Sequence, residues 1–209
     1  ALPPPPSPPP LPPNAPPAPS PPPPPSLPPP PPPPPALPPC APLGFGGEGL
    51  TELSFFSSTL TQSNLGGQGP DGGAEELRFS SIGVAPDGRV LDLVVTATTA
   101  YEPNNAERNS VSGDFGIINL LSDRAVGLRF CFESGSTLVP LDRFVMSFYD
   151  FDNAKSGMRE QLIAGNFTSA RTSVSVPTQI ERGTLADGRS TFTSTETGVG
   201  ADNPNRATV

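Results

Sequence analysis

Proline is concentrated at one end of this chain and divides it into two parts with different physical properties. Of the 34 prolines, 28 lie in the first 42 residues. Residues 1–39 contain no charged residue, no glycine and no aromatic ring. They therefore lack both turn chemistry and the apolar surface that a folded core requires. We expect residues 1–42 to form an extended segment and residues 43–209 to form one folded domain.

Consecutive prolines favour a single backbone conformation. The pyrrolidine ring fixes φ and removes the backbone N–H, so a run of prolines adopts the left-handed polyproline II helix. At about 3.1 Å per residue, residues 1–39 would form a rod about 120 Å long. The alternatives are a disordered linker or a ligand for a small proline-binding domain. The absence of a flanking Arg or Lys argues against the ligand.

The charge of the chain limits its partners. Twenty acidic and 12 basic residues give a net charge of −8, which repels nucleic acid and anionic membrane surfaces. No run of 18 apolar residues is present, so we expect no membrane insertion. The start at Ala1 is what removal of a signal peptide would leave, and a piece of a longer chain would look the same. We expect the protein to be secreted.

A two-residue periodicity runs through the second part of the sequence. Leu91, Leu93 and Val95 alternate with other residues, and pairs such as Asp87-Gly88 and Asp187-Gly188 mark turns. The predicted strands are 50–60, 75–84, 89–101, 114–121, 125–133, 141–151, 159–167, 171–181 and 189–197. Residues 141–151 are apolar on both faces, which predicts a central strand. The fold class expected is all-β, an antiparallel two-sheet sandwich resembling a jelly roll.

The residue inventory argues against catalysis. The sequence has no histidine and only two cysteines, which excludes a Ser-His-Asp triad and removes the usual zinc ligands. The pair Asp150 and Asp152 could serve a glycosidase, but two carboxylates this close on one strand are more often a solvated strand end. We expect that the protein is not an enzyme and that it requires no cofactor.

An oxygen-rich sequence at the end of one predicted strand could bind calcium. Asp150, Asp152 and Asn153 supply carboxylate and amide oxygens, and further oxygen ligands are available from Glu102, Asn104, Asn105 and Asp142. No calcium-loop spacing is present, and turn-forming residues that solubilise an edge are the alternative interpretation.

Covalent modification is expected at the two cysteines and at one asparagine. Cys40 and Cys131 would form a disulfide that ties the base of the rod to the sheet; a bridge between subunits and two free thiols are the alternatives. Asn166-Phe167-Thr168 is a sequon for N-glycosylation at Asn166.

The proline-rich segment resembles a known group of structural glycoproteins. The blocks that begin at Ser7 and Ser20 are similar to the Ser-Pro-Pro-Pro-Pro blocks of plant extensins and of the hydroxyproline-rich glycoproteins of green-algal walls, pherophorins and mastigonemes. Both tyrosines lie outside the segment and the domain is poor in cysteine, so the likeness is nearest to wall fibres and mastigonemes. The resemblance implies proline hydroxylation and O-glycosylation, with the sites Ser7, Ser20, Ser26, Pro8, Pro9, Pro21, Pro22, Pro28 and Pro29.

Two functions from different classes follow from these observations. The first is a structural subunit of an extracellular fibre or filament, of the cell-wall, mastigoneme or glycofibril type, that self-associates through its glycosylated rod. The second is a carbohydrate-binding or adhesion module on a stalk, with calcium as a possible cofactor.

Overall fold

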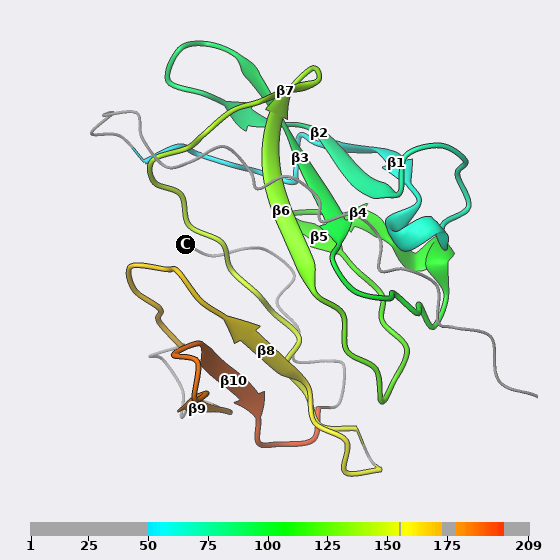
Figure 1. Cartoon of the computed structure of the whole chain (residues 1–209), viewed down its shortest axis with the longest axis vertical. Helices are drawn as coiled ribbons and strands as arrows, with labels where there is room; N and C mark the ends of the chain where they lie inside the picture. Colours follow the sequence, from blue (N-terminus) through cyan, green and yellow to red (C-terminus); the bar gives the residue numbers. More distant parts are fainter. Residues whose placement is uncertain (1–49, 155, 173–178, 199–209) are drawn as a thin grey trace, which may run out of the picture. The chain divides into compact units, whose positions relative to one another are not determined.

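The computed structural model describes residues 50–154, 156–172 and 179–198, hereafter the described residues. They form antiparallel β-sheets together with two short 3-10 turns, η1 (Leu65–Gly67) and η2 (Ala106–Arg108), and no α-helix occurs in this part of the chain (Figure 1). The all-β, antiparallel character predicted from the two-residue periodicity is confirmed. The predicted rod, residues 1–42, lies outside the described residues.

The largest element is a five-stranded sheet. Its strands are β1 (Thr59–Ser63), β2 (Glu76–Val84), β3 (Val90–Ala97), β6 (Leu128–Ser134) and β7 (Thr137–Leu138). They lie in the order β1-β2-β3-β6-β7, and every neighbouring pair is antiparallel. The predicted strands at 75–84, 89–101 and 125–133 correspond to β2, β3 and β6.

The register of the three central strands creates the core. Leu93 pairs with Phe79 on one side and with Phe132 on the other, and Val95 pairs with Leu77 and with Phe130. Directly opposed residues of a sheet point to the same face, so these rows form one apolar surface. Leu77, Phe79, Leu93, Val95 and Phe132 are all buried there.

The opposite face of the same strands carries an arginine surrounded by three carboxylates. Arg78 on β2 contacts Glu76 at 2.8 Å, Asp92 on β3 at 3.3 Å and Glu133 on β6 at 2.7 Å. Burial lowers the pKa of Arg78, but the hydrogen bonds and charges of Glu133 and Glu76 outweigh burial and raise it. Because the pairs join three strands, a shift of register would separate the arginine from its carboxylates.

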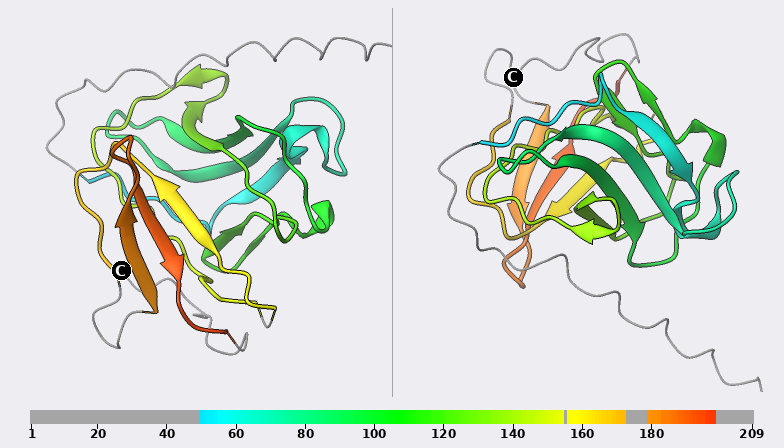
Figure 2. Two further views of the ribbon diagram at one scale, coloured as in Figure 1. Left: turned by 60° about the horizontal axis from the view of Figure 1, so that its bottom comes forward. Right: turned by 90° about the horizontal axis from the view of Figure 1, so that it is seen from above.

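The described residues form two smaller sheets in addition to the five-stranded one. β4 (Ser110–Ser112) and β5 (Phe115–Ile117) form a hairpin, and β8 (Gln161–Ala164), β10 (Ser190–Ser194) and β9 (Ile180–Thr184) form a sheet in the order β8-β10-β9 (Figure 2). The β2–β3 and β9–β10 turns have the same chemistry. In each, an Asp-Gly-Arg sequence places Gly88 or Gly188 at φ near +85°, as the turn prediction requires.

The prediction for residues 141–151 is wrong. Leu141 is buried, but the chain from Arg143 to Asp150 forms no ladder and only Met146 in it is half-buried. Beyond Asp150, an isolated antiparallel bridge between Asn153 and Arg159 closes a turn that leads into β8. Asp150, at φ +65°, has a left-handed backbone that a continuous strand does not accommodate.

The strand predicted at 171–181 overlaps the observed strand only at its end. β9 begins only at Ile180, and residues 173–178 lie outside the described residues.

A buried polar network fixes the long connection between β3 and β6. The Tyr101 hydroxyl donates to the carbonyl of Asn119 and accepts from Asn109 Nδ2 at 3.1 Å. Asn109 Oδ1 in turn accepts from the Asn119 N–H at 2.8 Å. Tyr101 and Asn109 are both buried, so these groups depend on one another for hydrogen bonds.

Replacement of Tyr101 tests this network. The Tyr101→Phe variant keeps the packed ring but leaves the half-buried Asn119 carbonyl and the buried Asn109 amide without their partner. We expect the free energy of unfolding to fall by about 1–3 kcal/mol in urea titrations followed by circular dichroism. The matched control is Tyr149→Phe. Tyr149 is 37% exposed, and its hydroxyl makes no hydrogen bond to any described residue. Equal stability of the two variants would contradict the assigned network.

Candidate functional site

The predicted calcium ligands lie at the end of the hairpin that leads into β8. Ser194 on β10 is fully buried and organises this corner. Its hydroxyl lies 2.6 Å from Asn153 Oδ1 and accepts from the Glu160 N–H at 2.9 Å. The N–H of Asp152 lies 3.4 Å from Glu160 Oε2. The corner therefore brings Glu160, which sequence reasoning did not select, next to Asp152 and Asn153.

The electrostatics of this corner act on Glu160. Glu160 is exposed at the surface, and partial desolvation by its neighbours raises the pKa of its carboxyl above the usual value of 4.5. The N–H of Asp152 lowers this pKa, and the negative charges of Asp150 and Asp152 raise it further. A carboxyl whose pKa is raised on folding binds its proton more tightly in the native state. The free energy of unfolding therefore falls as the pH rises through the window between the unfolded and the folded pKa.

Glu160→Gln isolates this effect. The amide oxygen can still accept from Asp152, but the charge that conflicts with Asp150 and Asp152 is removed. In metal-free buffer we expect the variant to be more stable than the parent at pH 7 and equally stable near pH 4, as measured by urea unfolding at both values.

Glu52, an exposed carboxylate outside this corner, provides a control for the loss of one negative charge, because Glu52→Gln should not reproduce the gain in stability at pH 7. A Glu160→Gln variant no more stable than its parent at pH 7 would contradict this account.

The described residues show no set of side chains arranged to coordinate calcium. In residues 50–154, 156–172 and 179–198, no three His, Cys, Asp or Glu side chains come together as a metal would require. The further candidates lie elsewhere: Glu102 pairs with Arg124 at 2.9 Å, and Asn105 caps η2 through the Glu107 N–H. Calcium binding at Asp150, Asp152 and Asn153 stays a prediction.

The predicted modification sites fall partly within the described residues. Cys131 on β6 is disulfide-bonded and not a free thiol, but Cys40 lies outside the described residues, so its pairing with Cys131 stays a prediction. Asn166 follows β8 in an exposed position at φ +59°, which leaves it accessible for glycosylation. The predicted O-glycosylation and hydroxylation sites, from Ser7 to Pro29, lie outside the described residues.

A group of partly exposed rings within residues 144–149 is the feature that sequence reasoning missed. Phe144, Phe148 and Tyr149, hereafter the aromatic platform, are 41%, 44% and 37% exposed. Each ring contacts a more interior ring edge-on: Phe144 with Phe132 at 5.0 Å, Phe148 with Phe130 at 6.3 Å and Tyr149 with Phe115 at 5.1 Å between centroids. These contacts hold the rings in place while part of each stays open to solvent.

The backbone of the aromatic platform has no hydrogen-bond partner in the described part of the chain. Among the described residues, no hydrogen bond joins any N–H or C=O of residues 144–149, whereas the carbonyl of the preceding Arg143 accepts from the Thr51 N–H at 3.1 Å. Val145, between the rings, is 62% exposed. An apolar segment with unpaired backbone groups is a ready site for a second chain.

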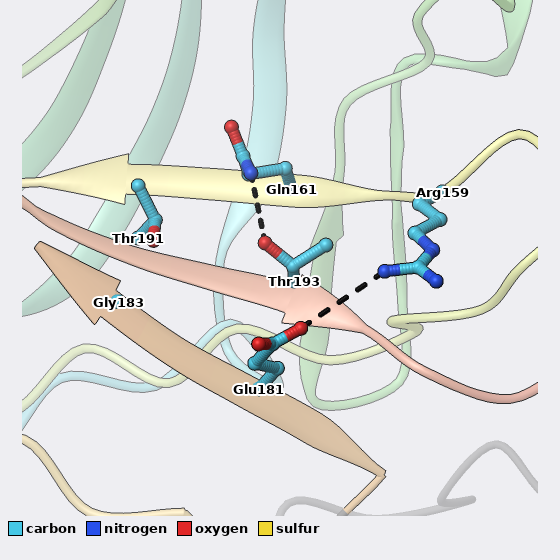
Figure 3. A pocket seen from close by; sticks show the side chains of 6 residues that line it. All are labelled: Arg159, Gln161, Glu181, Gly183, Thr191 and Thr193. Atoms are coloured by element: carbon cyan, nitrogen blue, oxygen red, sulfur yellow. Dashed lines mark hydrogen bonds and ion pairs between the residues drawn. The ribbon is translucent and has the colours of Figure 1, made fainter. Parts of the chain in front are cut away.

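A shallow polar depression lies on one face of the three-stranded sheet (Figure 3). It is lined by Arg159, Gln161, Glu181, Gly183, Thr191 and Thr193. Gln161 donates to Thr193 at 2.8 Å, and Arg159 lies 4.0 Å from Glu181. A Cβ at Gly183 would come within 2.7 Å of the Thr191 hydroxyl, so glycine keeps the depression open. Its lining has hydrogen-bonding groups but no aromatic ring.

Comparison of the chain with protein-family models, with curated proteins and with solved structures found no match. No helix among the described residues is long and apolar enough to cross a membrane. The aromatic platform, the corner formed by Asp152, Asn153 and Glu160, and the polar depression are thus the features that bear on function.

Proposed function

We propose that this protein is a structural subunit of an extracellular glycoprotein fibre. The observation that carries the proposal is the aromatic platform, whose partly exposed rings are held by interior rings and whose backbone groups bond to none of the described residues. Its counterpart in the sequence is the proline-rich segment, whose composition predicts the stiff, extended rod that a fibre needs. In this account the rod and the domain are both assembly elements, and head-to-tail contacts between copies extend the filament.

The finer architecture belongs to the same proposal. The ring contacts join Phe144 and Phe148 to Phe132 and Phe130, which belong to the core rows of β6. A second layer built from residues 141–151 and the β8-β10-β9 sheet, packed on the five-stranded sheet, would be the two-sheet sandwich expected from the sequence.

A stalked carbohydrate-binding module is the second candidate. Sugars stack on aromatic rings and accept hydrogen bonds from Arg, Gln and Thr side chains, and the aromatic platform and the polar depression offer these groups separately. The two are not combined in one depression among the described residues, which is why the fibre is the preferred function.

Electron microscopy of the natively produced protein, with mass spectrometry of the same sample, tests the proposal. We expect regular filaments, and peptides from residues 1–39 that carry hydroxyproline with attached pentose or hexose, so that the mass exceeds the 21.6 kDa of the unmodified chain. The control is the chain from a bacterial host, which lacks these modifications. Unmodified single particles that bind a glycan array would contradict the fibre and favour the carbohydrate-binding module.

A further inference from the structure

The aromatic platform is the one apolar surface in the described residues that combines braced rings with unpaired backbone groups. We infer that it is a docking site for the polyproline segment of a neighbouring copy of this chain, with the eight-proline run Pro28–Pro35 as the principal ligand. This inference rests on the fibre function proposed above and names the contact that would join one subunit to the next.

The shape and chemistry of the rings fit a polyproline II ligand. Proline-rich segments dock on grooves lined by aromatic side chains, and both partners lose little conformational freedom because the ligand is already stiff. Phe144 and Phe148 are four positions apart, about 13 Å along an extended chain, which corresponds to about four residues of polyproline II. Within the run Pro28–Pro35, the prolines that follow the predicted modification sites Pro28 and Pro29 are long enough to cover both rings.

The hydrogen-bonding groups are complementary as well. A proline has a carbonyl acceptor but no N–H, so a polyproline segment needs only donors from its partner. Residues 144–149 supply backbone N–H groups that bond to none of the described residues. A polyproline ligand could therefore be held by both ring contacts and backbone hydrogen bonds.

Charge favours this ligand over a contact between two domains. Every charged residue of the chain lies after position 42, and the net charge there is −8, so two domains repel each other. The proline segment has no charge and approaches the aromatic platform, with Asp150 beside it, without that repulsion.

Photo-crosslinking of the full chain tests the contact directly. A benzoylphenylalanine residue replaces Phe148, and equal amounts of isotope-labelled and unlabelled copies are mixed before irradiation. We expect crosslinks to peptides that contain Pro28–Pro35, joining labelled to unlabelled copies. The control carries the same photoreactive residue at Phe56, which is 77% exposed and has no ring partner among the described residues. Crosslinks within one copy, or to other peptides only, would overturn the inference.

Affinity measurements on variants provide a second, independent test. Phe148→Ala should weaken self-association of the full chain by about tenfold or more, because aromatic residues dominate such interfaces. Phe56→Ala should leave it unchanged. Since Phe148→Ala could disturb folding, a third chain keeps the domain intact and replaces Pro28–Pro35 by glycine and serine; it should lose association to a similar extent. Wild-type association in this chain would overturn the inference.

The outcomes for this contact and for the fibre can be told apart. Filaments that persist in Phe148→Ala with unchanged self-association would leave the fibre standing and overturn the docking site. Crosslinks to Pro28–Pro35 in a protein that never forms filaments would support the docking site and contradict the fibre. Loss of glycan binding in Phe148→Ala, with self-association intact, would assign the aromatic platform to sugars and overturn the inference.

Discussion

The pairing of β2, β3 and β6 is the constraint on which the rest of the domain depends. Because side chains alternate along a strand, one register buries Leu77, Leu93 and Val95 together and places Arg78 among its carboxylates on the other face. A shift by one residue would exchange the two faces, exposing the core and burying the charges. The apolar rows and the arginine network therefore select the same register, and this register also places Phe130 and Phe132 where they contact Phe148 and Phe144.

The sequence predicted well those elements whose formation depends on local pattern. The alternation at Leu91, Leu93 and Val95 identified β3, and the Asp-Gly pairs at 87–88 and 187–188 identified two turns whose geometry requires glycine. The sequence-based prediction was wrong where strand formation depends on hydrogen bonds to a neighbouring segment. Residues 141–151 have the composition of a central strand, but a strand exists only if neighbours bond to its backbone, and no described residue does so along 144–149.

The same reasoning explains what was missed at the candidate sites. Asp150, Asp152 and Asn153 were visible as an oxygen-rich sequence. Glu160 reaches them through the hairpin closed by the Asn153–Arg159 bridge, whereas Ser194 reaches them only through the β8–β10 pairing, which no local pattern encodes. The aromatic platform was hidden for a different reason. Its residues were assigned to the core because they are apolar on both faces, whereas in the structure each ring is only half covered. A segment that looks like a core strand but lies at the surface is itself a signal for an intermolecular contact.

The central claim is that the aromatic platform is covered when the protein assembles. Hydrogen exchange at the backbone amides of residues 144–149, compared between dilute chain and assembled protein by mass spectrometry, tests it most directly. The amides have no acceptor among the described residues and should exchange rapidly in dilute solution, then become protected on assembly. Equally rapid exchange in both states, while other regions gain protection, would show that assembly uses a different surface and would contradict the account.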